Sequence, residues 1–306
     1  MRYVEAAGVR VSAIGLGTWQ FGSGDWGYGL DYARTIAPAI LKRALELGVT
    51  LIDTAETYGS GASELIVGTV VRDAARDPFI ATKFTPLLPI RSVMVDHAER
   101  SRRRLQVAAI DLYQLHFPNP IVPVREQAAG LRRVLDLGIA RHVGVSSHSV
   151  RRWEAMERAL GRPVISNQIE FSLARSGPTR DHLPYAVAHD RLVIAFSPLG
   201  QGLLAGDHPR RMNPARWLRR ILGSAQARHI AAVREAIRDV AAVHDATMAQ
   251  VALAWLISHP NVVAIPGART IEQLESNVRA ADLELTPDEL ARLTSVADEL
   301  TDRRGR

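Results

Sequence analysis

The sequence contains no cysteine. Disulfide bonds, thiolate nucleophiles and metal sites built on cysteine are therefore excluded. Lysine is nearly absent as well, because Lys42 and Lys83 are the only lysines among 38 basic residues. Arginine fills almost every other basic position, so each remaining lysine is a candidate for a role that a titratable amine can serve and a guanidinium cannot.

Long hydrophobic runs are also missing. No stretch of about 18 apolar residues occurs, so no membrane-spanning helix is expected. Residues 1–18 lack the charged segment followed by an apolar segment that marks a signal peptide, and we expect a cytoplasmic protein. The net charge is +6, but the arginines are spread along the chain among acidic residues. We therefore expect an anionic cofactor rather than nucleic acid as the partner of the basic clusters.

Short apolar segments alternate with helix-like segments along most of the chain. A small hairpin is expected from residues 2–7 and 9–14, and the buried strands that follow are expected at 12–18, 49–53, 79–83, 110–115, 140–145, 164–168, 191–196 and 262–265. Helices are expected at 35–47, from Ser63, and at 91–105, 124–137, 149–160, 178–189, 228–243, 247–258 and 270–280, with a last helix starting at Thr286. Residues 197–226 are expected to be irregular.

Eight strands, nearly all followed by helices, indicate a closed (β/α)8 barrel of the TIM type with an N-terminal β-hairpin and extra helices. The alternative is an open doubly wound sheet, which would require a Gly-x-Gly-x-x-Gly turn after its first strand. The segment Gly15-Leu-Gly17-Thr-Trp-Gln does not supply that turn. No linker, low-complexity segment or repeat interrupts the chain, so residues 1–306 are expected to form a single domain.

Four side chains that can carry or transfer protons follow successive strands: Asp53, Tyr58, Lys83 and His116. Taken one at a time, each has an ordinary structural explanation, such as a helix cap, a loop anchor, a solvent-facing charge or a core histidine. Active sites of β/α barrels lie at the carboxyl ends of the strands. Together the four residues therefore predict an active site there.

Eight sequence motifs occur in one order along the chain. They are LIDTAETYGSGASELIVG (51–68), ATKF (81–84), IDLYQLHFPNP (110–120), GVSSHS (144–149), NQIEFSLA (167–174), SPLGQGLLAG (197–206), AQVALAWLI (249–257) and IPGARTIEQLESNVRA (265–280). With these motifs the chain resembles the aldo-keto reductases from about residue 3 to residue 285. The resemblance implies a barrel fold, bound NADPH and reversible reduction of a small-molecule aldehyde or ketone to an alcohol.

The resemblance also implies roles for the four residues. Tyr58 would donate the proton, and the ammonium of Lys83 would lower the pKa of the phenol from its ordinary value of about 10. Asp53 would pair with Lys83 and hold its charge in place. His116 would hydrogen-bond to the carbonyl oxygen and orient the substrate.

Further residues are expected to hold the cofactor. The nicotinamide would contact Ser146, Ser147 and Gln168, although the family often has asparagine where this chain has Ser147. Trp19 would also contact the cofactor. The pyrophosphate would lie on a glycine-rich loop formed by Ser197, Pro198, Leu199, Gly200, Gln201, Gly202 and Leu203. The adenosine end would be held by Ile265, Pro266, Gly267, Arg269, Thr270, Gln273 and Asn277, with Arg269 favouring NADPH over NADH.

Aromatic side chains are expected to form the walls of the substrate pocket: Trp19, Trp26, Phe84 and Phe117. Such walls favour apolar or ring-bearing carbonyl compounds. Two other functions stay open from the sequence. One is a cofactor-binding regulatory subunit resembling potassium-channel β subunits, and the other is a biosynthetic enzyme that uses the same site for dehydrogenation or dehydration. The sequence indicates no oligomeric state.

Overall fold

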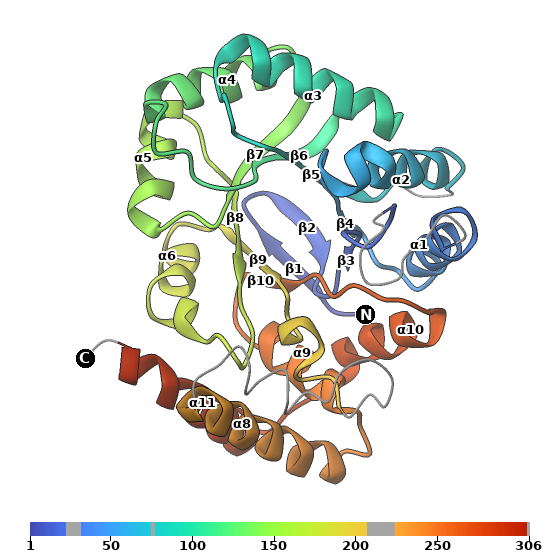
Figure 1. Ribbon diagram of the computed structural model, residues 1–306, viewed down its shortest axis with the longest axis vertical. Coiled ribbons are helices and arrows are strands. Elements are labelled where there is room, and N and C mark those ends of the chain that lie inside the picture. The colour runs from blue at the N-terminus through green and yellow to red at the C-terminus, as the bar shows by residue number, and fades with distance from the viewer. Residues whose placement is uncertain (23–31, 75–76, 207–223, 305–306) are drawn as a thin grey trace.

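The computed structural model describes residues 1–22, 32–74, 77–206 and 224–304 (Figure 1). At its centre is a parallel sheet with the strand order β10-β9-β8-β7-β6-β5-β4-β3. The strands are β3 (Leu16–Gly17), β4 (Leu51–Asp53), β5 (Phe79–Phe84), β6 (Ile110–Leu115), β7 (Ala140–Ser146), β8 (Ser166–Glu170), β9 (Leu192–Phe196) and β10 (Val262–Ala264). Every strand predicted from the sequence is present, with ends that differ by a few residues at most.

The sheet closes on itself between its first and last strands. Ile14 forms a parallel bridge with Ala264, and the Gly15 amide donates to the Ala264 carbonyl at 2.8 Å. Further along, the Gly17 amide donates to the Pro266 carbonyl at 3.2 Å. The predicted (β/α)8 barrel is thereby confirmed.

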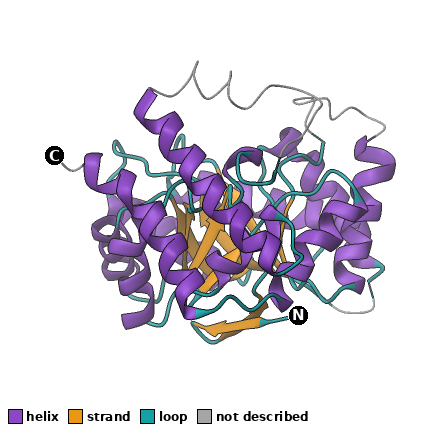
Figure 2. Ribbon diagram, turned by 90° about the horizontal axis from the view of Figure 1, so that it is seen from below, coloured by secondary structure: helices purple, strands orange, loops and turns teal. Residues whose placement is uncertain are grey.

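The N-terminal hairpin, β1 (Tyr3–Ala6) and β2 (Val9–Ser12), lies across the amino-terminal end of the barrel (Figure 2). The Ser12 hydroxyl accepts a hydrogen bond from the Thr50 amide at 2.9 Å, just before β4. Val11 packs with Leu51 and Leu112 in an apolar cluster at this end of the barrel. The hairpin therefore seals one end of the barrel and leaves the carboxyl ends of the strands as the open face.

Helices surround the barrel (Figure 1). They are α1 (Ala37–Glu46), α2 (Ala62–Arg72), α3 (Arg91–Leu105), α4 (Val124–Asp136), α5 (Val150–Leu160), α6 (His182–Ala188), α8 (Ser224–Val243), α9 (Met248–Ile257), α10 (Ile271–Arg279) and α11 (Pro287–Arg304). Shorter helical turns are a π-helical turn at Tyr32–Ile36 and 3-10 turns at Tyr58–Gly61, Gly177–Arg180, Gly200–Gly202 and Ala280–Asp282. The apolar faces of the long helices pack on the outer face of the sheet around large buried residues such as Trp153 and Trp255.

Two helix predictions need correction. The helix expected at 178–189 is broken at Asp181, which has φ −135° and accepts a hydrogen bond from the His182 amide at 2.7 Å. That capping bond starts a new helix and separates it from the preceding 3-10 turn. The segment expected to be irregular, 197–226, contains a 3-10 turn at Gly200–Gly202 and the beginning of α8 at Ser224.

Among the described residues, no helix alone has the length and apolar composition to cross a membrane. Residues 227–243 and 248–257 have that length and composition only when taken together, and the two helices are bent by 98° relative to each other.

The barrel seam gives a test of the fold. A Cβ added to Gly17 would lie 2.8 Å from the Ile265 carbonyl oxygen, which is main chain and cannot rotate away. We expect Gly17→Ala to lower the free energy of unfolding by about 1–3 kcal/mol in urea denaturation. Gly130→Ala in α4 is the matched control, because its Cβ meets side-chain atoms of Met94, closest to the Sδ and Cε at 2.9 Å, and not main chain, and because alanine favours a helix. Equal losses in the two variants would contradict the role of the seam.

Candidate active site

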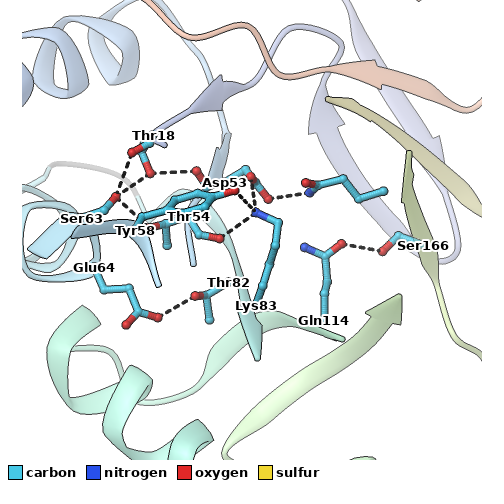
Figure 3. Close-up of polar contacts among 11 residues, drawn as sticks. Thr18, Asp53, Thr54, Tyr58, Ser63, Glu64, Thr82, Lys83, Gln114 and Ser166 are labelled. Atoms are coloured by element: carbon cyan, nitrogen blue, oxygen red, sulfur yellow. Dashed lines mark hydrogen bonds and ion pairs between the residues drawn. The ribbon is translucent and has the colours of Figure 1, made fainter. Parts of the chain in front are cut away.

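The four predicted proton-handling residues lie at the carboxyl ends of adjacent strands. Figure 3 shows three of them, Asp53, Tyr58 and Lys83, joined by hydrogen bonds. Asp53 is the last residue of β4, and Tyr58 begins the 3-10 turn that follows it. Lys83 lies near the end of β5, and His116 follows directly after β6. Because β4, β5 and β6 are neighbours in the sheet, the barrel itself assembles this cluster.

Lys83 is fully buried and donates three hydrogen bonds. Its Nζ lies 2.5 Å from Asp53 Oδ1, 2.9 Å from the Thr54 carbonyl oxygen and 3.2 Å from Tyr58 Oη. An ammonium has three protons and no lone pair, so these three acceptors satisfy it completely. Tyr58 must accept in this arrangement, and its own proton therefore points away from Lys83.

Asp53 connects the cluster to the opposite side of the barrel. Its second oxygen, Oδ2, accepts a hydrogen bond from Gln168 Nε2 at 2.7 Å. Gln168 lies on β8, which is four strands away from β4 in the closed sheet. The carboxylate is thus held by a cation on one side and an amide across the barrel on the other.

A small hydroxyl network binds the carbonyl of Asp53 and the side chain of Thr54, which follows it. Thr18 Oγ1 donates to the Asp53 carbonyl at 2.9 Å, and Ser63 Oγ lies 2.8 Å from both Thr18 Oγ1 and Thr54 Oγ1 (Figure 3). All three hydroxyl residues are buried. The network ties the end of β3 to the start of α2 around the loop from Thr54 to Gly61, so this loop is held at both ends.

The pKa of Tyr58 departs from the sequence-based expectation. Burial of the phenol raises its pKa above the ordinary value of 10. The Lys83 charge lowers it, as expected, but the Asp53 charge raises it again. The prediction of a net lowering is therefore wrong, because burial, the largest cause, disfavours the phenolate and the Asp53 charge opposes that of Lys83. The phenol keeps its proton at neutral pH.

His116 lies beside the phenol. The ring centroids of Tyr58 and His116 are 5.8 Å apart with an edge-to-face geometry. Burial, with the nearby Lys83 charge, lowers the pKa of His116 to about 4. Its Nδ1 is buried and has no hydrogen-bond partner among the described residues. At neutral pH the site therefore holds a neutral imidazole next to a protonated phenol.

Of the residues predicted to hold the nicotinamide, Ser146 ends β7, Ser147 follows it and Gln168 lies on β8. Ser146 and Gln168 are buried, while Ser147 is exposed in a left-handed conformation with φ +57°. The Ser147 amide donates to the Gln168 carbonyl at 2.8 Å, and Asn167 Nδ2 donates to the His148 carbonyl at 2.7 Å. The structure thus brings Ser146, Ser147 and Gln168 together at one edge of the sheet.

The glycine-rich loop follows β9. Ser197 has φ +48°, and the Gly200 amide donates to its carbonyl at 2.8 Å, which makes a tight turn. Gly202 has φ +93°, is exposed, and nothing lies within 4 Å of a Cβ added there. Such an open glycine turn next to β8 and β10 fits an anionic group that approaches the main chain closely.

The last predicted cofactor segment follows β10. Arg269 and Thr270 are exposed, and Thr270 caps α10 by accepting from the Gln273 amide at 3.3 Å. The Gln273 side chain accepts from the Arg269 amide at 2.9 Å. Asn277 is buried and donates to the Gly267 carbonyl at 3.4 Å, so it braces the loop. An exposed arginine at a helix N-terminus has the donor chemistry that a phosphate requires.

The predicted substrate residues divide into three groups. Trp19 and Phe117 are exposed by 46% and 39% and remain candidates for a wall. Phe84 is fully buried and packs its ring edge-to-face on His97, so its assignment to the pocket wall is wrong. Trp26 lies outside the described residues. Among the described side chains, no cluster of three or more His, Asp or Glu could hold a metal ion.

Two contacts near the site were not predicted from the sequence. Gln20 Nε2 donates to the Ala268 carbonyl at 3.1 Å and so supports the loop after β10. Glu56, between Asp53 and Tyr58, contacts His97 on α3. The sequence does show a carboxylate inside the loop that carries the phenol. It does not show the partner of that carboxylate, because His97 lies 41 residues further along the chain.

Comparison with known proteins identifies the family. A model described as the aldo/keto reductase family matches residues 13–298. The chain belongs to this family. An uncharacterised oxidoreductase of Mycobacterium tuberculosis is 48% identical over 300 residues, covering 97% of this chain and 93% of the relative. The aldo-keto reductase YhdN of Bacillus subtilis is 32% identical over 299 residues, covering 90% and 87%.

Solved structures of aldo-keto reductases share the fold. A thermostable aldo-keto reductase in complex with the inhibitor epalrestat has a TM-score of 0.81 and 30% identity, covering 97% of this chain and all of the other. An aldo/keto reductase of Klebsiella pneumoniae in complex with NADP and acetate has a TM-score of 0.77 and 30% identity, covering 97% and 94%. This aldo/keto reductase is thus an oxidoreductase with the barrel of its relatives.

The buried His148 gives a test of the electrostatics. Burial, together with the Arg152 charge, lowers its pKa to about 4, although its hydrogen bond to the Ser146 carbonyl acts in the opposite direction. Between pH 6.5 and 4 His148 is protonated in the unfolded chain but remains neutral in the folded protein. The free energy of unfolding should therefore decrease as the pH is lowered from 6.5 to 4. His148 alone should contribute a decrease on the order of 3 kcal/mol.

His148→Asn keeps a donor for the Ser146 carbonyl but cannot titrate. Urea denaturation at several pH values should show a shallower decline for this variant than for the wild type. His189→Asn, at an exposed position, serves as the control and should follow the wild-type slope. A wild-type slope in His148→Asn would contradict the assignment.

Proposed function

We propose that this aldo/keto reductase uses NADPH to reduce an aldehyde or ketone to an alcohol, with Tyr58 as the proton donor. The observation that supports the proposal most directly is the hydrogen bonding of Lys83. Its three protons go to Asp53, Thr54 and Tyr58 Oη, which leaves the Tyr58 proton free for another acceptor. A carbonyl oxygen placed against the phenol and His116 is such an acceptor.

Bound NADPH supplies the hydride that adds to the carbonyl carbon. The remaining requirements fall to the protein. Charge builds on the carbonyl oxygen as the hydride arrives, and a donor aimed at that oxygen stabilises it. Tyr58 transfers its proton there, and the adjacent Lys83 ammonium stabilises the phenolate that is left. The neutral His116 ring, 5.8 Å from the Tyr58 ring between centroids, can hydrogen-bond to the same oxygen and fix its direction.

The choice of cofactor is supported by the donors at the carboxyl ends of β7 to β10. Ser146, Gln168, the turn at Gly200–Gly202 and the start of α10 are consecutive around that half of the barrel. Arg269 adds a positive charge at the helix N-terminus, where the extra phosphate of NADPH would bind. Klebsiella pneumoniae aldo-keto reductases 29% and 30% identical to this chain were solved with NADPH and with NADP.

The proton donor can be tested with Tyr58→Phe, which removes only the hydroxyl. We expect the kcat for carbonyl reduction to fall by about 10²–10⁴-fold, because the acid is lost. The Kd for NADPH, measured by fluorescence titration, should change little. Tyr3→Phe is the control, because it removes a phenol hydroxyl at the sealed end of the barrel. Full activity of Tyr58→Phe would refute the assignment.

The cofactor preference can be tested with Arg269→Ala. Loss of the guanidinium should raise the Kd for NADPH by roughly 10-fold and leave that for NADH unchanged, since only NADPH carries the additional phosphate. Arg279→Ala, at the other end of α10, is the matched control and should alter neither value. A wild-type KM for NADH equal to or below that for NADPH would contradict the preference.

A further inference from the structure

Glu56 lies in the loop between Asp53 and Tyr58, and both of its carboxylate oxygens are engaged. Oε1 accepts from the Thr85 amide at 2.6 Å, and Oε2 lies 2.8 Å from His97 Nδ1. The Glu56 side chain is only 10% exposed. A buried carboxylate with two specific partners is a costly feature, and its position inside the catalytic loop gives it a direct route to the phenol.

The partners of Glu56 surround the end of β5. The Glu56 amide donates to the Lys83 carbonyl at 3.3 Å, so main chain and side chain of one residue bind either side of Phe84. The Phe84 carbonyl in turn accepts from the His116 amide at 2.9 Å. The segment from Lys83 to Thr85 is therefore the point at which the Tyr58 loop, the ammonium and the imidazole are joined.

His97 anchors this arrangement to the helix layer. It lies on α3, and its ring packs edge-to-face on buried Phe84 with centroids 5.2 Å apart. The hydrogen bond to Glu56 thus connects the catalytic loop to a helix as well as to a strand. Because α3 and β5 pack against one another in the core, this second connection limits movement of the loop away from the strand.

We propose that Glu56 and His97 form a positioning pair that holds Tyr58 Oη against Lys83 Nζ. The pair touches neither Oη nor Nζ, and it acts through the loop that carries the phenol. The proposal rests on the function proposed above for Tyr58. It adds two positioning residues to the cluster of Asp53, Tyr58, Lys83 and His116.

The test compares variants that remove the pair with variants that preserve its hydrogen bonds. Glu56→Ala and His97→Phe, which keeps a ring against Phe84, should each lower kcat by about 10–100-fold, because a displacement of about 1 Å at the reacting group has that effect. Their Kd for NADPH should stay within about 2-fold of wild type, since the predicted cofactor loops follow β7 to β10.

Glu56→Gln keeps an acceptor for the Thr85 amide, and His97→Asn keeps a donor near the position of Nδ1. Both variants should recover most of the lost kcat. The matched control is Glu157→Ala, which removes another carboxylate bound to a main-chain amide, that of Val164 at 3.0 Å. It should lower stability and leave the kcat of the folded enzyme near the wild-type value.

A crystal structure of Glu56→Ala separates this proposal from the proposed function. The distance between Tyr58 Oη and Lys83 Nζ, 3.2 Å in the wild type, should lengthen beyond hydrogen bonding. An unchanged distance with unchanged kcat would overturn the positioning pair and leave the role of Tyr58 intact. The two proposals fail separately. A wild type that reduces no carbonyl compound would refute the proposed function. An unchanged distance between Tyr58 Oη and Lys83 Nζ in Glu56→Ala would overturn the positioning pair, whatever the activity of the wild type.

Discussion

The ion pair between Lys83 and Asp53 is the constraint on which the rest of the site depends. Both side chains are buried, and taking two charges out of water is unfavourable unless every hydrogen-bonding position is satisfied. Thr54, Tyr58 and Gln168 supply the remaining partners. Loss of either charged partner would leave a bare buried charge at a cost of about 3–5 kcal/mol. The stability of the barrel and the hydrogen bonding of the phenol are therefore coupled through one pair.

The proton-handling residues and the positions proposed for the cofactor lie in different halves of the barrel. Strands β4, β5 and β6 carry the ion pair, the phenol and the imidazole, whereas the loops after β7 to β10 carry the serine, glycine and arginine positions proposed for the cofactor. The bond from Gln168 to Asp53 is a direct contact between these halves. Apart from this one contact, the division allows the loops of one half to vary without altering the geometry of the other, as is common in barrel enzymes.

The fold was predictable because its strands are short apolar segments with clear ends, and Lys83 was prominent because lysine is so rare in this chain. Residues adjacent in sequence were harder to place. Phe84 follows Lys83, but successive side chains of a strand point to opposite faces, so Lys83 points into the barrel and Phe84 points toward the helices. The pKa of Tyr58 depends on the sum of burial and two opposing charges, and the contact between Glu56 and His97 depends on how α3 packs. Neither quantity is local in the sequence.

The sealed end of the barrel has a consequence for how the hairpin and the ion pair are related. Val11 of the hairpin packs in the same apolar cluster as Leu51, the first residue of β4. Asp53 is the last residue of that same strand. The hairpin is therefore linked to the charged pair through one short strand, although the two lie at opposite ends of the barrel.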